Sequence, residues 1–448
     1  MKPLFYKILL FTISILLLTG KPAFAQVRPL TMENAVKLAL EKNRDLQVAT
    51  LETAKSTQKV REARSYALPT VAASAQYLYF PQKQVSFLPG SFVGLGENQL
   101  ATFRVGGSNA FVGGVAVSQP LFQAGIRSGV RAAQIYENAS AEGLNEVRAG
   151  VVTEVKKAYL DVLITQEQLR LQQQSLLRNE QALKDSRSLL AQGRASRVDT
   201  LRAFVSTENL RPEISRLSNR VEITKTILKR TMGLDEQEAI ELQDSLRYDK
   251  TGFVTPGTDA FFEAVQARPE VHRLELTEKL NREQIALQTA ERAPKLSAIG
   301  LLQSQAQANH LKLADYSWPL SSYVGLQVNV PIFSGFRTVS RIQQAVITRQ
   351  QSETQLVNLK EIVRAEVKIG LSNVEEARLR IETQRQTVTV AELGYRITRD
   401  RWKQGIASRL ELSDAELSLT QAKSNHLQAV YDFLTASVEL DKVMGRIR

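Results

Sequence analysis

The chain of 448 residues contains no cysteine, which excludes disulfide bonds, thiolate metal sites, a cysteine nucleophile and a lipid-modified N-terminal cysteine. Three histidines are too few for a histidine-rich metal site, and we expect no metal and no cofactor. Beyond residue 25, no apolar run approaches the roughly 18 residues that a transmembrane helix needs. If the protein crosses a membrane, it must do so as strands, because only helices and closed barrels satisfy the backbone in lipid.

The first 25 residues read as a secretory signal peptide. Lys2 and Lys7 supply the positive start, Ile8–Leu18 the apolar core and Ala23–Ala25 the A-x-A cleavage signal. Cleavage also removes Lys21, so the formal charge of +12 falls to +9. Such a basic chain could bind nucleic acid, but secretion makes nucleic acid an unexpected partner, and a solvated basic surface is the simpler interpretation.

The remaining sequence consists of two copies of an internal repeat. Residues 192–199 resemble residues 404–411 at an offset of 212, and further matches extend the similarity over 31–233 and 258–445. We therefore divide the chain into a signal peptide (1–25), repeat 1 (26–233), a linker (234–257) and repeat 2 (258–448).

Both repeats predict the same order of elements. Prolines end the first helix and border the strands, and apolar and polar residues alternate in the strands. The expected helices are 31–67, 127–192 and 196–232 in repeat 1, and 259–292, 337–404 and 408–444 in repeat 2. The expected strands are 71–80 and 111–119, then 296–305 and 322–330, with loops at 81–109 and 306–321 between them.

The two longest helices have a heptad pattern typical of coiled coils. Each would extend roughly 100 Å at 1.5 Å per residue, which calls for support from neighbouring helices. Apolar residues recur every seven positions in both copies, in register: Val155, Val162, Leu169, Leu176, Leu183 and Leu190, then Val367, Val374, Ile381, Val388, Tyr395 and Trp402. A seam in a long helical barrel and an ordinary two-stranded coiled coil both fit this pattern.

A tight helical hairpin follows each long helix. Gly193 and Gly405 suit the left-handed position just past a helix end. Ser196 and Ser408 suit the N-cap of the returning helix, and an acid follows each serine by three residues, which predicts a capping box.

Four strands per chain cannot close a barrel, and lipid does not tolerate open sheet edges. Because transmembrane barrels start at about eight strands, the chain must pool its strands with copies of itself. A dimer would supply eight strands and a trimer twelve, and larger barrels leave a water-filled lumen.

These features together resemble the TolC-type outer membrane efflux protein family. The resemblance covers about 31–445 and rests on the twofold repeat and on ordered motifs: Leu30–Asn43, Ala67-Leu68-Pro69, Gln119-Pro120-Leu121-Phe122 and the two Gln-Gly-x-Ala-Ser hairpins. Many members carry a lipidated N-terminal cysteine, and this chain departs from that subset.

The resemblance implies a mostly α membrane protein of α+β class. Its homotrimer has a 12-stranded β-barrel in the outer membrane, continued by a periplasmic α-helical barrel, with 234–257 in an equatorial belt. It implies an exit duct for tripartite efflux or type I secretion. The implied partners are outer-membrane lipid, a periplasmic adaptor (membrane fusion) protein and an inner-membrane transporter.

The resemblance also points to the hairpins as the periplasmic entrance. The adaptor-docking tips are Gln192, Gly193, Arg194, Ala195 and Ser196, and Gln404, Gly405, Ile406, Ala407 and Ser408. The predicted gate consists of Asp199, Glu411, Asp414 and Trp402, with the three acids forming carboxylate rings in a trimer. Helix capping alone would equally explain Asp199 and Glu411, and an exposed helix position would explain Asp414.

An enzyme and a poreless scaffold are the alternatives to a duct. No nucleophile–histidine–acid arrangement, phosphate loop or metal spacing stands out, so we do not expect an enzyme. A periplasmic coiled-coil scaffold or adaptor without a pore explains the helices but leaves the proline-bordered alternating strands unexplained.

Overall fold

The computed structural model describes residues 28–94, 96, 98–248, 257 and 259–447. The expected signal peptide lies outside the described residues, as does 249–256 of the linker. The described chain forms two compact units. One comprises the residues up to Glu52 with 141–272 and 357–448, and the other comprises 53–140 and 273–356. The units cut across the sequence repeats, because each repeat contributes to both.

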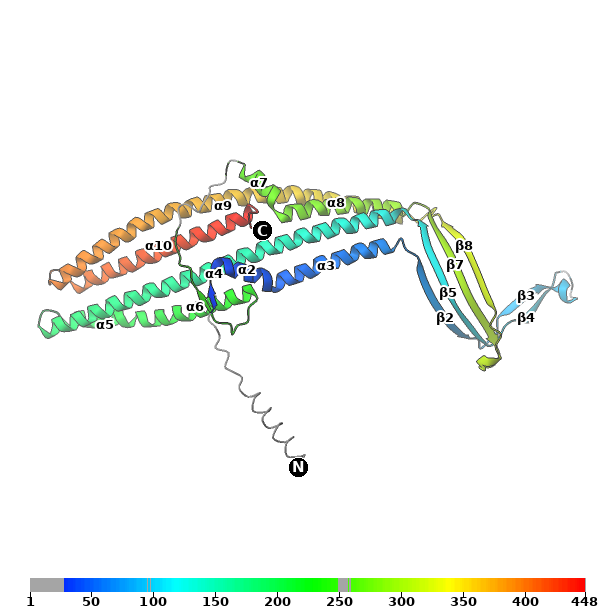
Figure 1. Ribbon diagram of the computed structural model, residues 1–448, viewed down its shortest axis with the longest axis horizontal. Coiled ribbons are helices and arrows are strands. Elements are labelled where there is room, and N and C mark those ends of the chain that lie inside the picture. Colours follow the sequence, from blue (N-terminus) through cyan, green and yellow to red (C-terminus); the bar gives the residue numbers. More distant parts are fainter. Residues whose placement is uncertain (1–27, 95, 97, 249–256, 258, 448) are drawn as a thin grey trace, which may run out of the picture. The chain divides into compact units, whose positions relative to one another are not determined.

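Figure 1 shows the elements, which follow one another along the chain. The first half contains β1 (Arg28–Leu30), α2 (Met32–Lys42), α3 (Arg44–Ser65), β2 (Thr70–Tyr79), β3 (Val85–Pro89), β4 (Leu100–Arg104), β5 (Asn109–Phe122), α4 (Ala124–Ala191), α5 (Arg197–Glu208) and α6 (Leu210–Met232). The second half contains β6 (Ile240–Leu242), α7 (Ala260–Ala267), α8 (Pro269–Ala290), β7 (Lys295–Ala308), β8 (Leu320–Asn329), α9 (Arg337–Lys403) and α10 (Arg409–Val443). Short 3-10 helices cover Gly90–Val93 and Leu313–Asp315.

The sheet unit is built on four antiparallel strands in the order β2-β5-β7-β8. The central strands β5 and β7 extend to 14 residues each, longer than the sequence predicts, because both are paired on two sides. The expectation that the second strand ends at Pro120 was wrong: β5 continues to Phe122 across a register shift between Pro120 and Phe122. Proline is tolerated there because a bulge does not need its missing N–H.

The segment 81–109 is not simply a loop. Its strands β3 and β4 pair as an antiparallel hairpin, with Val85 opposite Arg104 and Pro89 opposite Leu100. Exposed Phe87 and Leu100 lie within this hairpin.

Three expected single helices are broken in two. Asn43 separates α2 from α3, and its Oδ1 accepts from the backbone N–H groups of Asp45 and Leu46, at 2.9 and 3.1 Å, as an N-cap would. Arg268 separates α7 from α8 because Pro269 disfavours a helical residue before it. In the first return helix the break falls at Asn209, since Pro212 has no N–H for the carbonyl four residues earlier.

The long helices α4 and α9 are continuous over 68 and 67 residues. Most of the heptad positions are buried or partly buried, and the deepest are Val155, Val162, Val367, Val374 and Ile381. None of the helices in the described ranges is apolar over a stretch long enough to span a membrane.

The linker is attached to the first described strand. Its strand β6 pairs in parallel with β1. After β6, the Oδ2 of Asp244 accepts hydrogen bonds from the Met32 backbone N–H and from the Tyr159 hydroxyl, both at 2.8 Å. Tyr159 is fully buried in a cluster with Leu30, Leu228 and Met232, so this contact anchors the linker in the core of its unit.

Candidate functional site at the helical hairpins

Each hairpin turns on a glycine in the left-handed region, with φ of +71° at Gly193 and +80° at Gly405. The same bonds close both turns: the amides of Arg194 and Ile406 each donate to the carbonyl five residues earlier, at 2.9 Å. This pattern satisfies carbonyl groups that the ending helix leaves open. The sequence prediction of the turn glycines is confirmed.

Both capping boxes are present as predicted. The Asp199 amide donates to Ser196 Oγ at 3.1 Å, and Asp199 Oδ2 accepts from the Ser196 amide at 3.3 Å. In the second hairpin, the Glu411 amide donates to Ser408 Oγ at 3.1 Å and Glu411 Oε1 accepts from the Ser408 amide at 3.1 Å. The Ser408 amide and then its hydroxyl lower the pKa of Glu411 by stabilising the carboxylate.

Most of the predicted tip residues are accessible. Eight of the ten tip positions are exposed, namely Gln192, Gly193, Arg194, Ser196, Gln404, Gly405, Ile406 and Ser408. Ala195 is half-buried and Ala407 is buried. The tips therefore present polar and charged groups around one exposed apolar side chain, that of Ile406.

The residues of the predicted gate do not share one environment. Asp199 is half-buried, Glu411 is exposed, and Asp414 lies exposed on α10, three residues beyond the capping box. Trp402 is only 6% exposed and packs with Ala407 and Leu412 of its own hairpin, and Ala182 and Leu189 of α4 pack against the same cluster. Trp402 thus belongs to an apolar contact between the two hairpins, and its predicted part in a gate stays a prediction.

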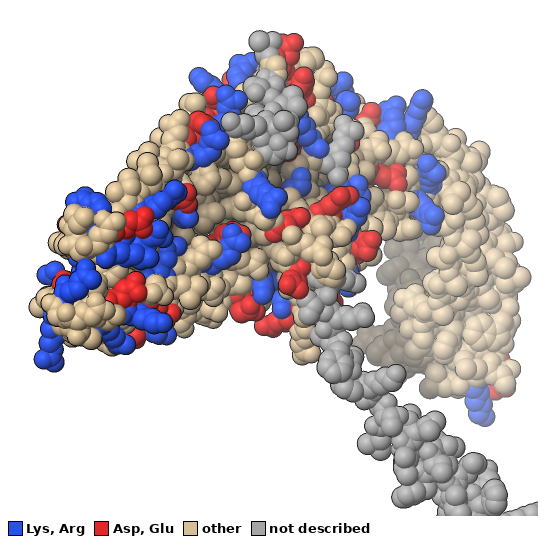
Figure 2. Space-filling model, turned by 60° about the vertical axis from the view of Figure 1, so that its left-hand side comes forward, with Lys and Arg blue, Asp and Glu red and all other residues tan. Residues whose placement is uncertain are grey.

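The return helices α5 and α10 lie alongside each other and enclose a shallow groove of about 370 Å³. Its lining is mainly apolar, with serines and two arginines: Val198, Leu201, Arg202, Val205, Ser206, Arg409, Leu410 and Ser413. Lys and Arg side chains gather at the hairpin ends, with Asp and Glu among them (Figure 2).

A charged cluster behind the tips was missed from the sequence. Arg178 of α4 donates from Nε to both carboxylate oxygens of Glu416 on α10, at 2.9 and 2.8 Å. The Ser175 hydroxyl donates to the same carboxylate at 2.9 Å. The signal was available: Glu416 falls on the buried stripe of α10 between Leu412 and Leu419, where a charge needs a partner.

Two further polar groups lie in this cluster. Arg409, the first residue of α10, is 4% exposed, and its Nε and Nη2 have no hydrogen-bond partner within the described chain. Burial lowers the pKa of Arg409, partly offset by the nearby charge of Glu416. Burial raises the pKa of Tyr395, and Glu416 raises it further. No group of three or more histidine, aspartate or glutamate side chains suited to a metal occurs in the described part of the chain.

The sequence matches the family described as outer membrane efflux protein over residues 35–234 and again over 262–446. The outer membrane efflux protein BepC of Brucella suis is 22% identical over 434 residues, covering 96% of this chain and 88% of BepC. The alkaline protease secretion protein AprF of Pseudomonas aeruginosa is 22% identical over 338 residues, covering 74% of this chain and 69% of AprF.

Similarity to solved structures agrees with the sequence comparison. A membrane protein from Pseudomonas aeruginosa superposes with a TM-score of 0.75 at 20% identity, over 92% of this chain and 93% of that one. At this identity the likeness establishes the fold, and it confirms the expected mostly α architecture with a small set of strands. The two family matches cover most of the sequence in both repeats, so the chain belongs to the outer membrane efflux protein family.

Proposed function

We propose that three copies of this chain form an exit duct through the outer membrane and that both hairpins of each copy surround its periplasmic entrance. The main support for this proposal is the sheet. Its outer strands are β2 and β8, and each pairs with one neighbour within the described chain. Lipid does not tolerate open edges, so we pair β8 of one copy with β2 of the next.

The exposed side chains of β8 support this placement. Val324, Leu326 and Val328 follow one another on one face and are 89%, 70% and 63% exposed in the single chain. Such a face is stable in contact with lipid. Eight strands leave an interior that side chains fill, whereas larger barrels leave an aqueous lumen, so three copies with twelve strands suit a duct better than two.

Family membership favours a channel over the poreless scaffold, and the family is one of efflux proteins rather than enzymes. By name, BepC is an efflux protein and AprF serves the secretion of alkaline protease. We infer that this duct receives its cargo from an inner-membrane transporter through a periplasmic adaptor. The exposed tips 192–196 and 404–408 are the proposed docking points of the adaptor.

The acids of the hairpins have two proposed roles. Asp199 and Glu411 are already engaged as capping partners, whereas Asp414 lies outside the box. In a trimer, each acid would be repeated three times around the entrance, and rings of carboxylates favour cations.

Assembly is tested with the full chain expressed in a Gram-negative host. We expect the protein in the outer-membrane fraction and a heat-modifiable trimer on gels. A soluble periplasmic monomer would contradict the duct.

The entrance is tested by separating charge from capping. In Glu411→Gln combined with Asp414→Asn, glutamine can still accept the Ser408 amide at the third helical position, so the cap is kept while the charge is lost. We expect higher single-channel conductance and weaker cation preference. Ser408→Ala is the matched control that disturbs the cap and keeps both charges. If only Ser408→Ala changes conductance, the acids serve capping alone.

A further inference from the structure

The register of the sheet separates its side chains into two different faces. Residues paired across antiparallel strands point the same way, so Val71, Val117 and Val324 share a face, joined through Gly300. Further pairs on this face are apolar, with Leu302 opposite Val115 and Leu326 opposite Ala298, and its polar residues are fewer, among them Ser304 and Ser322.

The opposite face is rich in amides and hydroxyls. Ser74, Gln303 and Ser321 form one row, joined through Gly114, and Gln327 pairs with Ser297 in another. Gln76 and Gln305 share a third row through Val112. Ile299 and Leu301 are interspersed on this face, so it is mixed, but it carries most of the sheet's polar side chains.

Charge is nearly absent from the sheet. Charged residues make up 23% of the chain, yet Lys295, the first residue of β7, is the only one in β2, β5, β7 and β8, all of whose residues are described. On the face in view in Figure 2, the surface of the sheet is almost entirely tan, in contrast to the blue and red of the helices.

We propose that the face bearing Gln303 and Gln327 lines the lumen of the barrel and that, beyond a ring of Lys295 at the start of β7, this part of the duct passes anions and cations alike. This inference rests on the proposed function, because only closure of the sheet makes one face luminal. The amides and hydroxyls of this face hydrogen-bond with water and with polar cargo of either sign. Its one charged side chain, Lys295, pairs with Asn329 at the start of β7, so a trimer would carry a single lysine ring at that end and no charged ring further along the strands. Selection by charge is then left to other parts of the duct, such as the carboxylates of the hairpins.

The absence of native cysteine allows a direct test with single cysteines in trimers reconstituted in lipid vesicles. Gln303→Cys and Gln327→Cys probe the proposed lumen. Leu302→Cys and Leu326→Cys are the matched controls, since each lies next in sequence and points to the other face. Each variant is treated from the barrel side with a cationic and with an anionic methanethiosulfonate, neither of which crosses lipid.

We expect both reagents to modify both glutamine-position variants and to lower their single-channel current. Reaction rates, each normalised to that of a free thiol in solution, should be similar for the two signs at Gln303→Cys. At Gln327→Cys the anionic reagent should react faster, because Gln327 pairs with Ser297, beside Lys295 on the same face. The leucine-position variants should stay unmodified. Reaction at the leucine positions instead would overturn the face assignment, and a preference of about tenfold or more for one sign at Gln303→Cys would overturn the uncharged lumen beyond Lys295.

These failures differ from a failure of the proposed function. If the cysteine variants form trimers with normal conductance before treatment, the duct stands and only the lumen assignment is at stake. If the unmodified protein forms neither trimers nor channels, the proposed function itself fails.

Discussion

Arg178 and Glu416 join the two repeats at the hairpin end, with the guanidinium Nε of Arg178 2.8 and 2.9 Å from the two carboxylate oxygens of Glu416. The glutamate side chain is only 9% exposed and also accepts from Ser175 and Thr420. A carboxylate in such a place depends on its cation, because desolvation is costly for an unpaired charge.

Replacing Arg178 by methionine should therefore loosen the contact between α4 and α10. Breaking a fully buried pair costs 3–5 kcal/mol, and because the Arg178 side chain is 22% exposed we expect about 2 kcal/mol. Hydrogen exchange of backbone amides in residues 412–420 should accelerate roughly thirtyfold.

Arg170→Met is the matched control, since Arg170 lies on the same helix, has a side chain that is 68% exposed and pairs with Glu167 three residues before it. Adding Glu416→Gln to Arg178→Met should restore much of the lost protection, because no buried charge then remains unpaired. Equal exchange in Arg178→Met and the native protein would show that the pair contributes nothing to the contact.

For Arg409 we expect the opposite effect, because its removal should not destabilise the helix. Its buried Nε and Nη2 find no partner in the described chain, so the guanidinium carries a desolvation cost without full compensation. Arg409→Met should leave the stability of the first turns of α10 unchanged or raise it by about 1 kcal/mol, so that their amides exchange at the native rate or more slowly. The repeat supplies the control, Arg197→Met, at the equivalent and exposed first position of α5. Faster exchange in Arg409→Met would mean that a group outside the single chain binds this guanidinium in the assembled protein.

The features found from the sequence are those determined by neighbouring residues. Gly193 and Ser196 act through bonds that span five residues or fewer, so their spacing alone predicted the turn and the cap. The strand alternation likewise identified β8 to within two residues at its start and one at its end.

The features missed depend on residues far apart in the chain. Asn43 breaks a helix that looked continuous, and its side-chain amide donates to the carbonyl of Thr231, 188 residues away. Glu416 meets Arg178 across 238 residues, so only its position on an apolar stripe hinted at the pair. Pro212 and Pro269 were visible in the sequence and could have placed two of the helix breaks.

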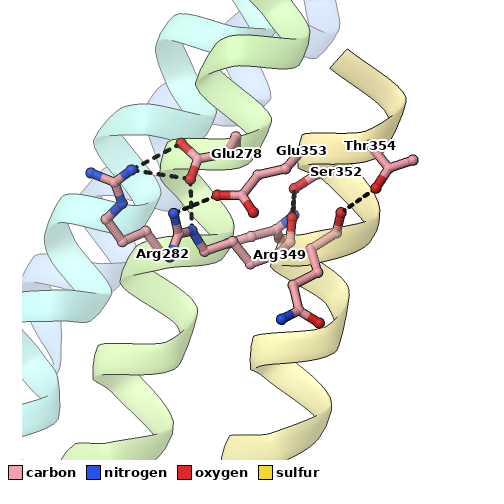
Figure 3. Close-up of polar contacts among 8 residues, drawn as sticks. Glu278, Arg282, Arg349, Ser352, Glu353 and Thr354 are labelled. Atoms are coloured by element: carbon pink, nitrogen blue, oxygen red, sulfur yellow. Dashed lines mark hydrogen bonds and ion pairs between the residues drawn. The ribbon is translucent and has the colours of Figure 1, made fainter. Parts of the chain in front are cut away.

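The sheet unit should lose stability in acid through Glu278. Figure 3 shows this carboxylate between Arg349 of α9 and Arg282 of α8, with Nε of Arg349 at 2.7 Å and Nη2 of Arg282 at 3.1 Å. The hydrogen bond from Arg349 is the main cause that lowers the pKa of Glu278 below its usual 4.5. A carboxyl with a lowered pKa stabilises the fold above its unfolded pKa, and that contribution is lost as pH falls through the folded value.

Thermal unfolding of the full chain, followed by circular dichroism between pH 7 and pH 3, checks this expectation. Below about pH 4.5, Glu278→Gln should lose less stability than the native protein, because it has no carboxylate to protonate there. Arg349→Gln should flatten the acid limb in the same way, since it removes the main cause of the shift. An acid limb unchanged in both variants would contradict a stabilising role for this carboxylate.

Tyr159 gives the sharpest test of how the linker is held. Its hydroxyl lies 2.8 Å from both the Leu30 carbonyl and Asp244 Oδ2 and can donate to only one of them at a time. Burial first, and then Asp244, raise the pKa of Tyr159, so the hydroxyl keeps its proton and remains a donor at any physiological pH. Tyr159→Phe preserves the ring in the core and removes this donor, while the Leu30 carbonyl keeps the Gln243 amide and the exposed Asp244 keeps the Met32 amide. The cost should be about 0.5–1.5 kcal/mol, seen as roughly two- to tenfold faster exchange of the amides in β1 and β6. Tyr66→Phe, which removes an exposed hydroxyl bonded to Glu62, should leave these amides unchanged. If β1 and β6 exchange at the native rate in Tyr159→Phe, the linker is held by packing of Leu30 and its apolar neighbours rather than by this hydrogen bond.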